Sequence, residues 1–292
     1  MCDSFISIIK AEAQLAPMYA AAVITGAGTE YWRNPQCNSA NNSHSVTKAF
    51  IAAAVGALRD DGRLSLEDKI TSFFTAEEMP ENMDTRWREV TVEHALQHKT
   101  GLDTIPYDVD ADDSTTVIGR DYLKYVFSLP IEHVPGEYRR YSDAAYYLLS
   151  RVIAEASGMT ADRFLRERFF VPLQFREWAM SCCPCGHAIG GGGFYSRADD
   201  VAKLGFMYAC GGVYEGNRMI SQNWIDISVK NDYAFAPFRD TDVFVKTGAY
   251  GQMIAFSIRK RTATAWHGFS KQNGNDRNDR LLEAFVKCLD KK

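Results

Sequence analysis

A long apolar run stands in the first quarter of the chain, at residues 49–58, directly behind a lysine, Lys48. Its residues are apolar on every face of a helix rather than along one stripe. This pattern predicts a helix that is buried all round. Two aspartates and a glycine at 60–62 mark its end.

Strand-like segments occur near both ends of the sequence. Residues 18–25 and 29–32 flank a glycine-containing turn, which predicts a pair of neighbouring strands. Three further strands are expected at 243–248, 253–258 and 262–266.

Helical patterns fill the middle of the chain and also occur at its ends. The expected helices are 4–15, 90–98 with Thr91 as N-cap, 121–129, 144–156 ending at Gly158, 160–169, 221–229 and 279–289. Residues 196–199 are similar to a capping box that opens one more helix through Met207.

Strands at both ends with helices between them indicate a sheet built from both termini and an inserted helical region. We expect residues 1–40 and 190–292 to form the sheet subdomain, and residues 41–189 to form the helical subdomain. Ser45 then falls at the seam between them, where we expect a catalytic cleft.

Composition excludes several classes of protein. The chain has 292 residues, is 46% hydrophobic and 24% charged, and carries a net charge of −4 without a basic block, so nucleic-acid binding is not expected. No apolar stretch is long enough to span a bilayer. The N-terminus lacks a secretory pattern, and the seven cysteines are an odd number without framework spacing, which favours a cytoplasmic protein, although a removed leader stays open.

A serine and a lysine stand three residues apart at the head of the buried helix. Ser45 and Lys48 would share one helix face, about 5–6 Å apart between Cβ atoms. Burial would lower the pKa of the Lys48 ammonium so that it could accept a proton, and the helix dipole would favour an alkoxide at Ser45. This is the pattern of an activated serine nucleophile. An N-cap serine with a solvated lysine is the alternative for an isolated match.

Two further motifs follow in an order that resembles a known family. The three are Ser45-Val46-Thr47-Lys48, Tyr141-Ser142-Asp143 and Lys246-Thr247-Gly248. They resemble the penicillin-recognising serine hydrolases, specifically the class C β-lactamase-related group, which also contains D-alanyl-D-alanine peptidases and family VIII esterases. Segments 94–102, 141–158 and 190–205 also resemble that family, so the resemblance covers most of the chain.

The resemblance implies an α+β, β-lactamase/transpeptidase-like fold, with an antiparallel sheet flanked by terminal helices and an inserted, mainly helical region. It also implies roles for single residues. Ser45 would be acylated, and Lys48 and Tyr141 would share the general-base work. Lys246 and Thr247, followed by Gly248, would hold a substrate carboxylate. The backbone N–H groups of Ser45 and Ala249 would form the oxyanion hole.

One position departs from the family pattern, because Asp143 stands where the family usually has asparagine. An ionised carboxylate cannot donate a hydrogen bond, and it would pair with Lys48 and hold that lysine charged. The departure counts against β-lactam turnover, whereas the intact Lys246-Thr247-Gly248 favours a substrate that bears a carboxylate.

Two groups of histidine and cysteine residues are candidates for a metal site. His94 and His98 have zinc-compatible spacing, but no glutamate follows His94 directly and no third ligand is indicated, which favours structural roles. Cys182, Cys183 and Cys185 with His187 are too closely spaced for one metal to take them all, so an unpaired loop is expected, with adventitious metal binding or oxidation left open.

The sequence therefore predicts a serine hydrolase that forms an acyl-enzyme and cleaves an amide, peptide or ester. A true β-lactamase or D-alanyl-D-alanine carboxypeptidase is one alternative. A penicillin-binding sensor that is acylated without turnover is another. We expect no cofactor and no metal, a small-molecule or peptide substrate and no nucleic acid, and the oligomeric state stays open.

Overall fold

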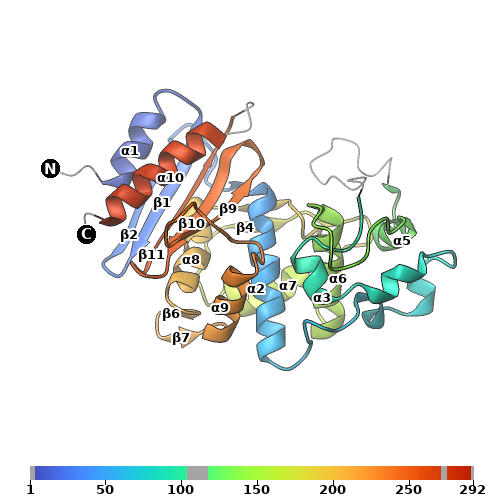
Figure 1. Ribbon diagram of the computed structural model, residues 1–292. Coiled ribbons are helices and arrows are strands. Elements are labelled where there is room, and N and C mark those ends of the chain that lie inside the picture. The colour runs from blue at the N-terminus through green and yellow to red at the C-terminus, as the bar shows by residue number, and fades with distance from the viewer. Residues whose placement is uncertain (1–3, 104–117, 271–274, 291–292) are drawn as a thin grey trace. The chain divides into compact units, whose positions relative to one another are not determined.

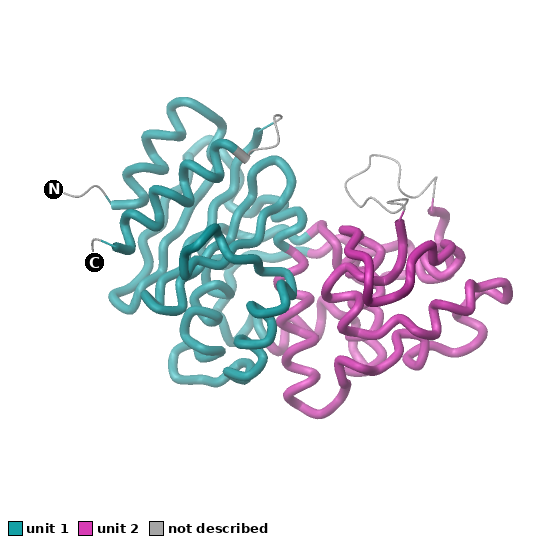
Figure 2. The backbone as a smooth tube through the Cα atoms, viewed as in Figure 1, with its two compact units in different colours: residues 1–46, 169–179, 194–292 teal, residues 47–168, 180–193 magenta. Residues whose placement is uncertain are grey.

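The structure is a computed structural model that describes residues 4–103, 118–270 and 275–290. The chain forms two compact units, coloured separately in Figure 2. Unit 1 comprises residues 1–46, 169–179 and 194–292, and unit 2 comprises residues 47–168 and 180–193. Residues 41–46 and 169–179 thus belong to the sheet-bearing unit, although we expected them in the helical subdomain. Residues 190–193 belong to unit 2, although we expected them in the sheet subdomain.

Unit 1 is built on a six-stranded antiparallel sheet in the order β2-β1-β11-β10-β9-β8 (Figure 1). The strands are β1 (Met18–Thr25), β2 (Gly28–Arg33), β8 (Ala236–Pro237), β9 (Val243–Gly248), β10 (Gln252–Ser257) and β11 (Thr262–Gly268). N-terminal β1 pairs directly with C-terminal β11. The predicted sheet from both termini is therefore confirmed.

Helices cover both faces of this sheet. On one face, α1 (Phe5–Glu12) and α10 (Asn275–Asp290) pack against side chains such as Met253 and Trp266 (Figure 1). On the other face, α8 (Ala198–Ala209) contacts β1, β10 and β11. The central strands β1, β10 and β11 are buried along nearly their whole length, which explains their largely apolar sequences.

A glycine lets α8 approach the sheet closely. A Cβ atom at Gly205 would lie 3.2 Å from both Ala263 Cβ and Ile254 Cγ1. Gly205 stands inside a helix, where glycine costs stability relative to alanine. Close packing of the helix on the sheet compensates for this cost.

A small sheet of β3 (Asn41–Asn42), β5 (Phe194–Ser196) and β4 (Trp178–Met180) leads into the segment that carries Ser45. Directly after β3, the 3₁₀ turn η1 (His44–Val46) begins. The remaining elements of this unit are β6 (Val213–Tyr214), β7 (Asn217–Arg218), α9 (Gln222–Lys230) and the 3₁₀ turn η6 (Ala249–Gly251).

Unit 2 is helical. Its α-helices are α2 (Thr47–Asp60), α3 (Val92–Leu96), α5 (Tyr122–Ser128), α6 (Asp143–Ser157) and α7 (Ala161–Leu165). Short 3₁₀ turns connect them: η2 (Ile70–Phe73), η3 (Ala76–Glu78) and η4 (Thr85–Glu89). Helix α6 contacts α2, α3 and α7. All residues of α2 from Thr47 to Leu58 are buried, as its uniformly apolar sequence predicts.

Two local predictions need correction. Arg197, not Ser196, is the N-cap of α8, because the Ser196 hydroxyl donates to the Glu177 carbonyl and is not available to the helix. The helix expected at 160–169 is α-helical only to Leu165 and continues as the π-helical segment η5 (Arg166–Phe170).

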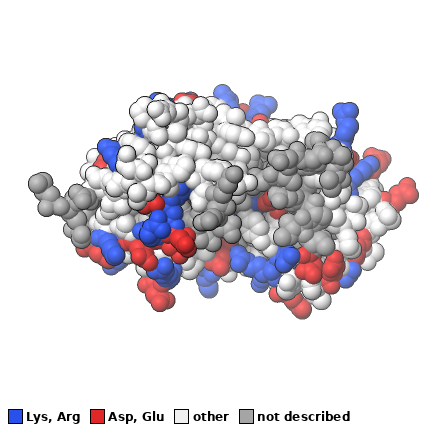
Figure 3. Space-filling model, turned by 90° about the horizontal axis from the view of Figure 1, so that it is seen from above, with Lys and Arg blue, Asp and Glu red and all other residues white. Residues whose placement is uncertain are grey.

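Acidic and basic side chains are interspersed on the face shown in Figure 3, without a large area of one sign among the described residues. In the described parts of the chain, no helix combines the length and the apolar character that crossing a membrane requires.

The packing of α8 gives a first prediction. Gly205→Val should lower the free energy of unfolding by about 1–3 kcal/mol, because the added methyl groups must displace Ala263 or Ile254. Gly26→Val is the matched control, since nothing lies within 4 Å of its Cβ position. Urea denaturation of both variants measures the difference, and an equal effect of the two would contradict this account of α8.

Candidate functional site

A lysine is fully buried at the start of α2 in unit 2. Lys48 has no exposed surface, and its Nζ donates to Asp143 Oδ1 and to the Gly191 carbonyl, each at 2.5 Å. An ammonium inside a protein requires such partners, because leaving a buried charge unpaired is strongly destabilising. Asp143 and the Gly191 carbonyl therefore make the buried charge of Lys48 tolerable.

The position of Asp143 follows from the start of α6. Ser142 is the N-cap, and its hydroxyl accepts from the Ala145 N–H at 3.4 Å. Asp143 is consequently the first residue of the helix, where a carboxylate is favoured by the helix dipole. Helix α6 packs on α2, which brings this carboxylate to Lys48.

The charge state expected for Lys48 needs correction. Burial alone lowers the pKa of the ammonium, but the nearby Asp143 carboxylate and Tyr141 outweigh it, so the pKa of Lys48 is raised above its usual value. The expectation that desolvation would turn this lysine into a neutral base is therefore wrong. The alternative expectation, that Asp143 holds Lys48 charged, agrees with the structure.

Tyr141 lies beside the same lysine. The Lys48 Nζ is 4.7 Å from the centroid of the Tyr141 ring, and 41% of Tyr141 is exposed. The ring also packs against His98, with centroids 4.4 Å apart and an angle of 31° between the planes. Tyr141 is thus a partly exposed side chain in contact with a buried positive charge.

His98 fixes the backbone on both sides of Tyr141. Its carbonyl accepts from the Arg140 N–H at 2.8 Å, and its Nδ1 accepts from the Ser142 N–H at 3.2 Å. His98 itself has a positive φ of 58°, which is unusual for a residue with a side chain. From the sequence we expected only a structural role for His98, and no local pattern indicates its contact with Tyr141.

The glycines of the 190–193 loop complete the lysine site. A Cβ atom at Gly190 would meet the Tyr146 carbonyl at 2.4 Å, and one at Gly191 would lie 2.8 Å from Asp143 Cβ. Only glycine lets this backbone approach α6 so closely and present the Gly191 carbonyl to Lys48. The sequence pointed to a tight turn here, but it could not identify the carbonyl as an acceptor.

In unit 1, Ser45 lies in the turn η1, two residues before α2 begins. The preceding Ser43 anchors this turn. Its N–H donates to the Phe194 carbonyl at 2.7 Å, and its carbonyl lies where a Cβ atom at Gly248 would be 2.4 Å away. Ser43 therefore ties the Ser45 turn both to β5 and to the end of β9.

The third motif forms the end of β9. Lys246 and Thr247 pair with Ile254 and Met253 of β10. On the other side, β8 pairs only as far as Val245, so in the described chain the edge of β9 from Lys246 onward carries no strand. Ala249 is exposed and opens η6. The turn η1 contacts β9, so unit 1 brings Ser45 and this edge together.

A histidine that the sequence did not single out supports Ser43. His267 in β11 is 1% exposed, and its Nε2 lies 3.1 Å from the Ser43 hydroxyl. Within the described residues its Nδ1 has no hydrogen-bond partner. Burial, together with the nearby His44, lowers the pKa of His267 to about 4. The imidazole is therefore neutral at physiological pH.

The predicted site residues thus form two groups. Lys48, Tyr141 and Asp143 meet in unit 2. The turn with Ser45 and the β9 edge, including Gly248 and Ala249, meet in unit 1. The groups are linked through the chain itself, because Ser45 precedes Lys48 by three residues.

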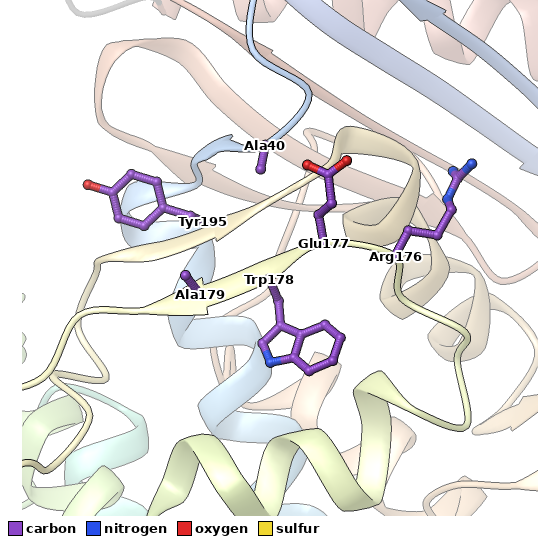
Figure 4. A pocket seen from close by; sticks show the side chains of 6 residues that line it. All are labelled: Ala40, Arg176, Glu177, Trp178, Ala179 and Tyr195. Carbon is purple, nitrogen blue, oxygen red and sulfur yellow. The ribbon is translucent and has the colours of Figure 1, made fainter.

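A cavity of about 350 Å³ opens beside the small sheet of unit 1 (Figure 4). It is lined by Ala40, Arg176, Glu177, Trp178, Ala179 and Tyr195. None of the predicted site residues lines it. Its charged walls are paired, Glu177 with Arg197 and Arg176 with Asp199, so the cavity offers no unpaired ionic group of its own.

Three of the candidate metal ligands make hydrogen bonds to other protein groups. His94 Nδ1 accepts from the Thr91 N–H, so His94 completes the cap of α3. Tyr147 OH donates to Cys183 Sγ, and Cys185 Sγ donates to the Arg120 carbonyl. The described residues contain no group of three His, Cys, Asp or Glu side chains that could hold a metal ion.

The chain belongs to the Beta-lactamase family, whose model matches residues 20–286. Members of this family are serine hydrolases. Protein flp of Staphylococcus aureus (strain MW2) is 27% identical over 136 residues, which make up 46% of this chain and 26% of that protein. The 6-aminohexanoate-dimer hydrolase of Paenarthrobacter ureafaciens is 24% identical over 196 residues, 62% of this chain and 48% of that protein.

The chain therefore spans only 26% and 48% of the lengths of these two relatives. Among solved structures, the β-lactamase/D-alanine carboxypeptidase from Pseudomonas syringae has a TM-score of 0.74 at 14% identity, covering 98% of this chain and 99% of that one. At this identity the likeness shows the fold, which is the predicted β-lactamase/transpeptidase-like fold.

His267 gives a prediction on pH and stability. Its folded pKa of about 4 lies below the usual value, so the unfolded chain binds the extra proton first as the pH falls. Stability from this group is full above about pH 6.5 and is lost as the pH drops toward 4. Between about pH 7.5 and about pH 5 the loss should be roughly 2 kcal/mol, at about 1.4 kcal/mol per pKa unit.

Urea denaturation of wild type and His267→Gln at both pH values measures this contribution. Glutamine keeps a polar partner for Ser43 but does not titrate, so the variant should lose less stability on acidification. The other histidines are present in both proteins and cancel in the comparison. Equal losses in the two proteins would show that His267 is not the buried neutral imidazole described here.

Proposed function

We propose that this chain is a serine hydrolase that acts through an acyl-enzyme on Ser45 and cleaves an amide, peptide or ester whose leaving part bears a carboxylate. The observation that carries the proposal is the buried Lys48, which contacts Tyr141 and follows Ser45 by three residues. A fold does not need a buried ammonium beside a half-exposed tyrosine, and such charge arrangements concentrate at functional sites.

In the first step, Tyr141 acts as the phenolate beside the Lys48 ammonium: the Ser45 oxygen attacks the substrate carbonyl carbon while its proton passes to the phenolate oxygen, which becomes the neutral phenol. The negative charge on the carbonyl oxygen is stabilised by the backbone N–H groups of Ser45 and Ala249, and removing one such donor typically costs about 10²–10³ in rate. The leaving amine or alcohol takes the proton from Tyr141. Water then releases the acyl group, with Tyr141 as base again.

In this mechanism the role of Lys48 is electrostatic. Because Asp143 keeps the pKa of Lys48 above its usual value, the lysine contributes a fixed positive charge rather than a proton acceptor. A positive charge in a buried site favours the negative charge that develops on nearby oxygens. Of the two bases that the family resemblance implies, this assigns proton transfer to Tyr141.

The substrate class is supported by the edge of β9. Lys246 provides an ammonium and Thr247 an exposed hydroxyl at a position without a β8 partner, as a carboxylate-binding edge requires. The relative from Paenarthrobacter ureafaciens is a hydrolase of 6-aminohexanoate dimer, whose name describes an amide that ends in a carboxylate. A short amide or ester whose leaving part bears a carboxylate fits both the edge of β9 and the name of this relative.

A second candidate is a protein that β-lactams acylate but that does not turn them over. The ion pair of Lys48 with Asp143 favours it, because a lysine held charged cannot serve as a base for deacylation. In this candidate, Ser45 would remain acylated by penicillin.

Intact-mass measurement after incubation with a fluorophosphonate, and separately with a penicillin, tests the proposal. We expect wild type to gain one fluorophosphonate adduct and Ser45→Ala to gain none. Ser72→Ala, which removes an exposed hydroxyl in η2, is the matched control and should label like wild type. A lasting penicillin adduct would support the second candidate. The lack of any adduct that depends on Ser45 would exclude both.

Asp143→Asn separates the two candidates, because it removes the carboxylate that keeps Lys48 charged. Without this carboxylate, burial lowers the pKa of Lys48, so a neutral lysine becomes available as a base. If the charged lysine is what prevents turnover, as in the second candidate, hydrolysis of a chromogenic cephalosporin should rise at least about tenfold, since general-base catalysis contributes roughly 10²–10⁴. If Lys48 acts as a fixed positive charge, as in the proposed mechanism, the variant should be slower than wild type. Asp121→Asn is the control, because asparagine also caps helices well and Asp121 is the N-cap of α5. No gain in turnover would argue against Asp143 as the limiting group.

A further inference from the structure

An aromatic residue occupies a strained backbone position next to the proposed oxyanion hole. Tyr250 follows Ala249 in η6 and has φ 60° and ψ 18°, the left-handed conformation. Side chains are unfavourable there because Cβ crowds the carbonyl oxygen, so such positions usually carry glycine or asparagine. A tyrosine at this point must be held by its surroundings, and strain of this kind concentrates at functional sites.

Two aromatic neighbours hold the Tyr250 ring. It stacks on Phe269, with ring centroids 5.3 Å apart and an angle of 16° between the planes. The His44 ring meets it edge-on at 5.1 Å and 66°. The Tyr250 carbonyl accepts from the Ser270 N–H at 3.1 Å. We call His44, Tyr250 and Phe269 the aromatic cluster.

The aromatic cluster is fixed yet open to solvent. Phe269 is anchored where β11 ends, because its N–H donates to the Pro17 carbonyl at 2.9 Å. Tyr250 is nevertheless 41% exposed, and His44 and Phe269 are only half-buried. A rigid aromatic surface of this kind can stack on a ligand without first having to be ordered.

The cluster adjoins both backbone groups that the proposed function places around the substrate carbonyl. His44 directly precedes Ser45, and Tyr250 directly follows Ala249. All of these residues belong to unit 1, where η1 contacts β9 and β10. After acylation the leaving part has departed, and the acyl group stays on Ser45 with its carbonyl oxygen at these N–H groups. The cluster is therefore next to the acyl group in both steps.

We propose that the aromatic cluster is the binding site for the acyl part of the substrate and that it selects a planar, aromatic acyl substituent. The proposal rests on the proposed function and adds its specificity. Stacking of aromatic rings supplies a favourable interaction beyond the burial of area. This role would explain why a strained side chain stands at position 250, because glycine would relieve the strain but has no ring to contact the acyl substituent.

Hydrolysis of two esters tests the proposal. The 3-carboxyphenyl esters of phenylacetic and acetic acid share the same carboxylate-bearing leaving group and differ only in the acyl substituent. The ratio of their kcat/KM values, phenylacetyl over acetyl, measures the selectivity. Wild type should prefer the phenylacetyl ester, and Tyr250→Gly should lower the ratio about five- to tenfold, as the loss of one ring stack predicts.

Two further variants serve as controls. Tyr250→Phe keeps the stack and should retain the wild-type ratio. Tyr195→Ala removes another tyrosine of unit 1 with the same 41% exposure and should also retain it. Because glycine relieves the left-handed strain at position 250, Tyr250→Gly should melt no more than slightly below wild type, and a small fluorophosphonate should still form one adduct that depends on Ser45.

The outcomes separate this inference from the proposed function. If Tyr250→Gly labels normally and its ester ratio equals that of wild type, the acyl group does not bind the aromatic cluster. If the ratio falls in Tyr195→Ala but not in Tyr250→Gly, the acyl group binds the cavity of Figure 4, which also overturns the inference. If wild type shows no Ser45 labelling, the proposed function is wrong, and this inference fails with it.

Discussion

The ion pair between Lys48 and Asp143 is the interaction on which the rest of unit 2 depends. An ammonium without exposed surface would be strongly destabilising if it were unpaired, so α6 must begin where a carboxylate can reach it. Ser142 sets that start by capping the helix. Gly191 must lack a side chain so that its carbonyl can approach as the second acceptor.

The same constraint explains the surroundings of Tyr141. His98 accepts its strained backbone conformation and binds the peptide groups on both sides of the tyrosine, which places the ring beside the lysine. In unit 1, Ser43 holds the backbone around Ser45 in a similar way. It links the turn of Ser45 to β5, to the end of β9 and to His267, so that three separate segments determine where this turn lies. The two groups of candidate residues are thus each held by backbone contacts that are distant in sequence.

The architecture could be predicted from sequence because its signals are local. The uniformly apolar run of α2, the paired strands at both ends and the N-cap at Thr91 each depend on neighbouring residues. For the site, the sequence could indicate which residues are candidates, but not how they interact. The sign of the Lys48 pKa shift depends on Asp143, which is 95 residues away, and desolvation alone gave the opposite direction.

Other features leave no local signal at all. A carbonyl acceptor such as that of Gly191 is a backbone group common to every residue. Tyr250 carries no mark of its left-handed conformation, and the neutral His267 is defined by its burial. The capping box expected at Ser196 failed for the same reason, since a tertiary contact with Glu177 took the hydroxyl. The roles of Ser45, Lys48, Tyr141 and the β9 edge in catalysis remain predictions.

The contact with Asp143 should keep the buried Lys48 an ammonium throughout the physiological pH range. Nitrogen-15 NMR of the lysine Nζ atoms tests it most directly, with the Lys48 signal assigned by its absence from Lys48→Met. We expect this signal to stay in the ammonium state beyond the pH at which exposed lysines titrate, about 10.4. A titration midpoint below about 9 would contradict it, because burial would then outweigh the carboxylate and Lys48 would be available as a neutral base.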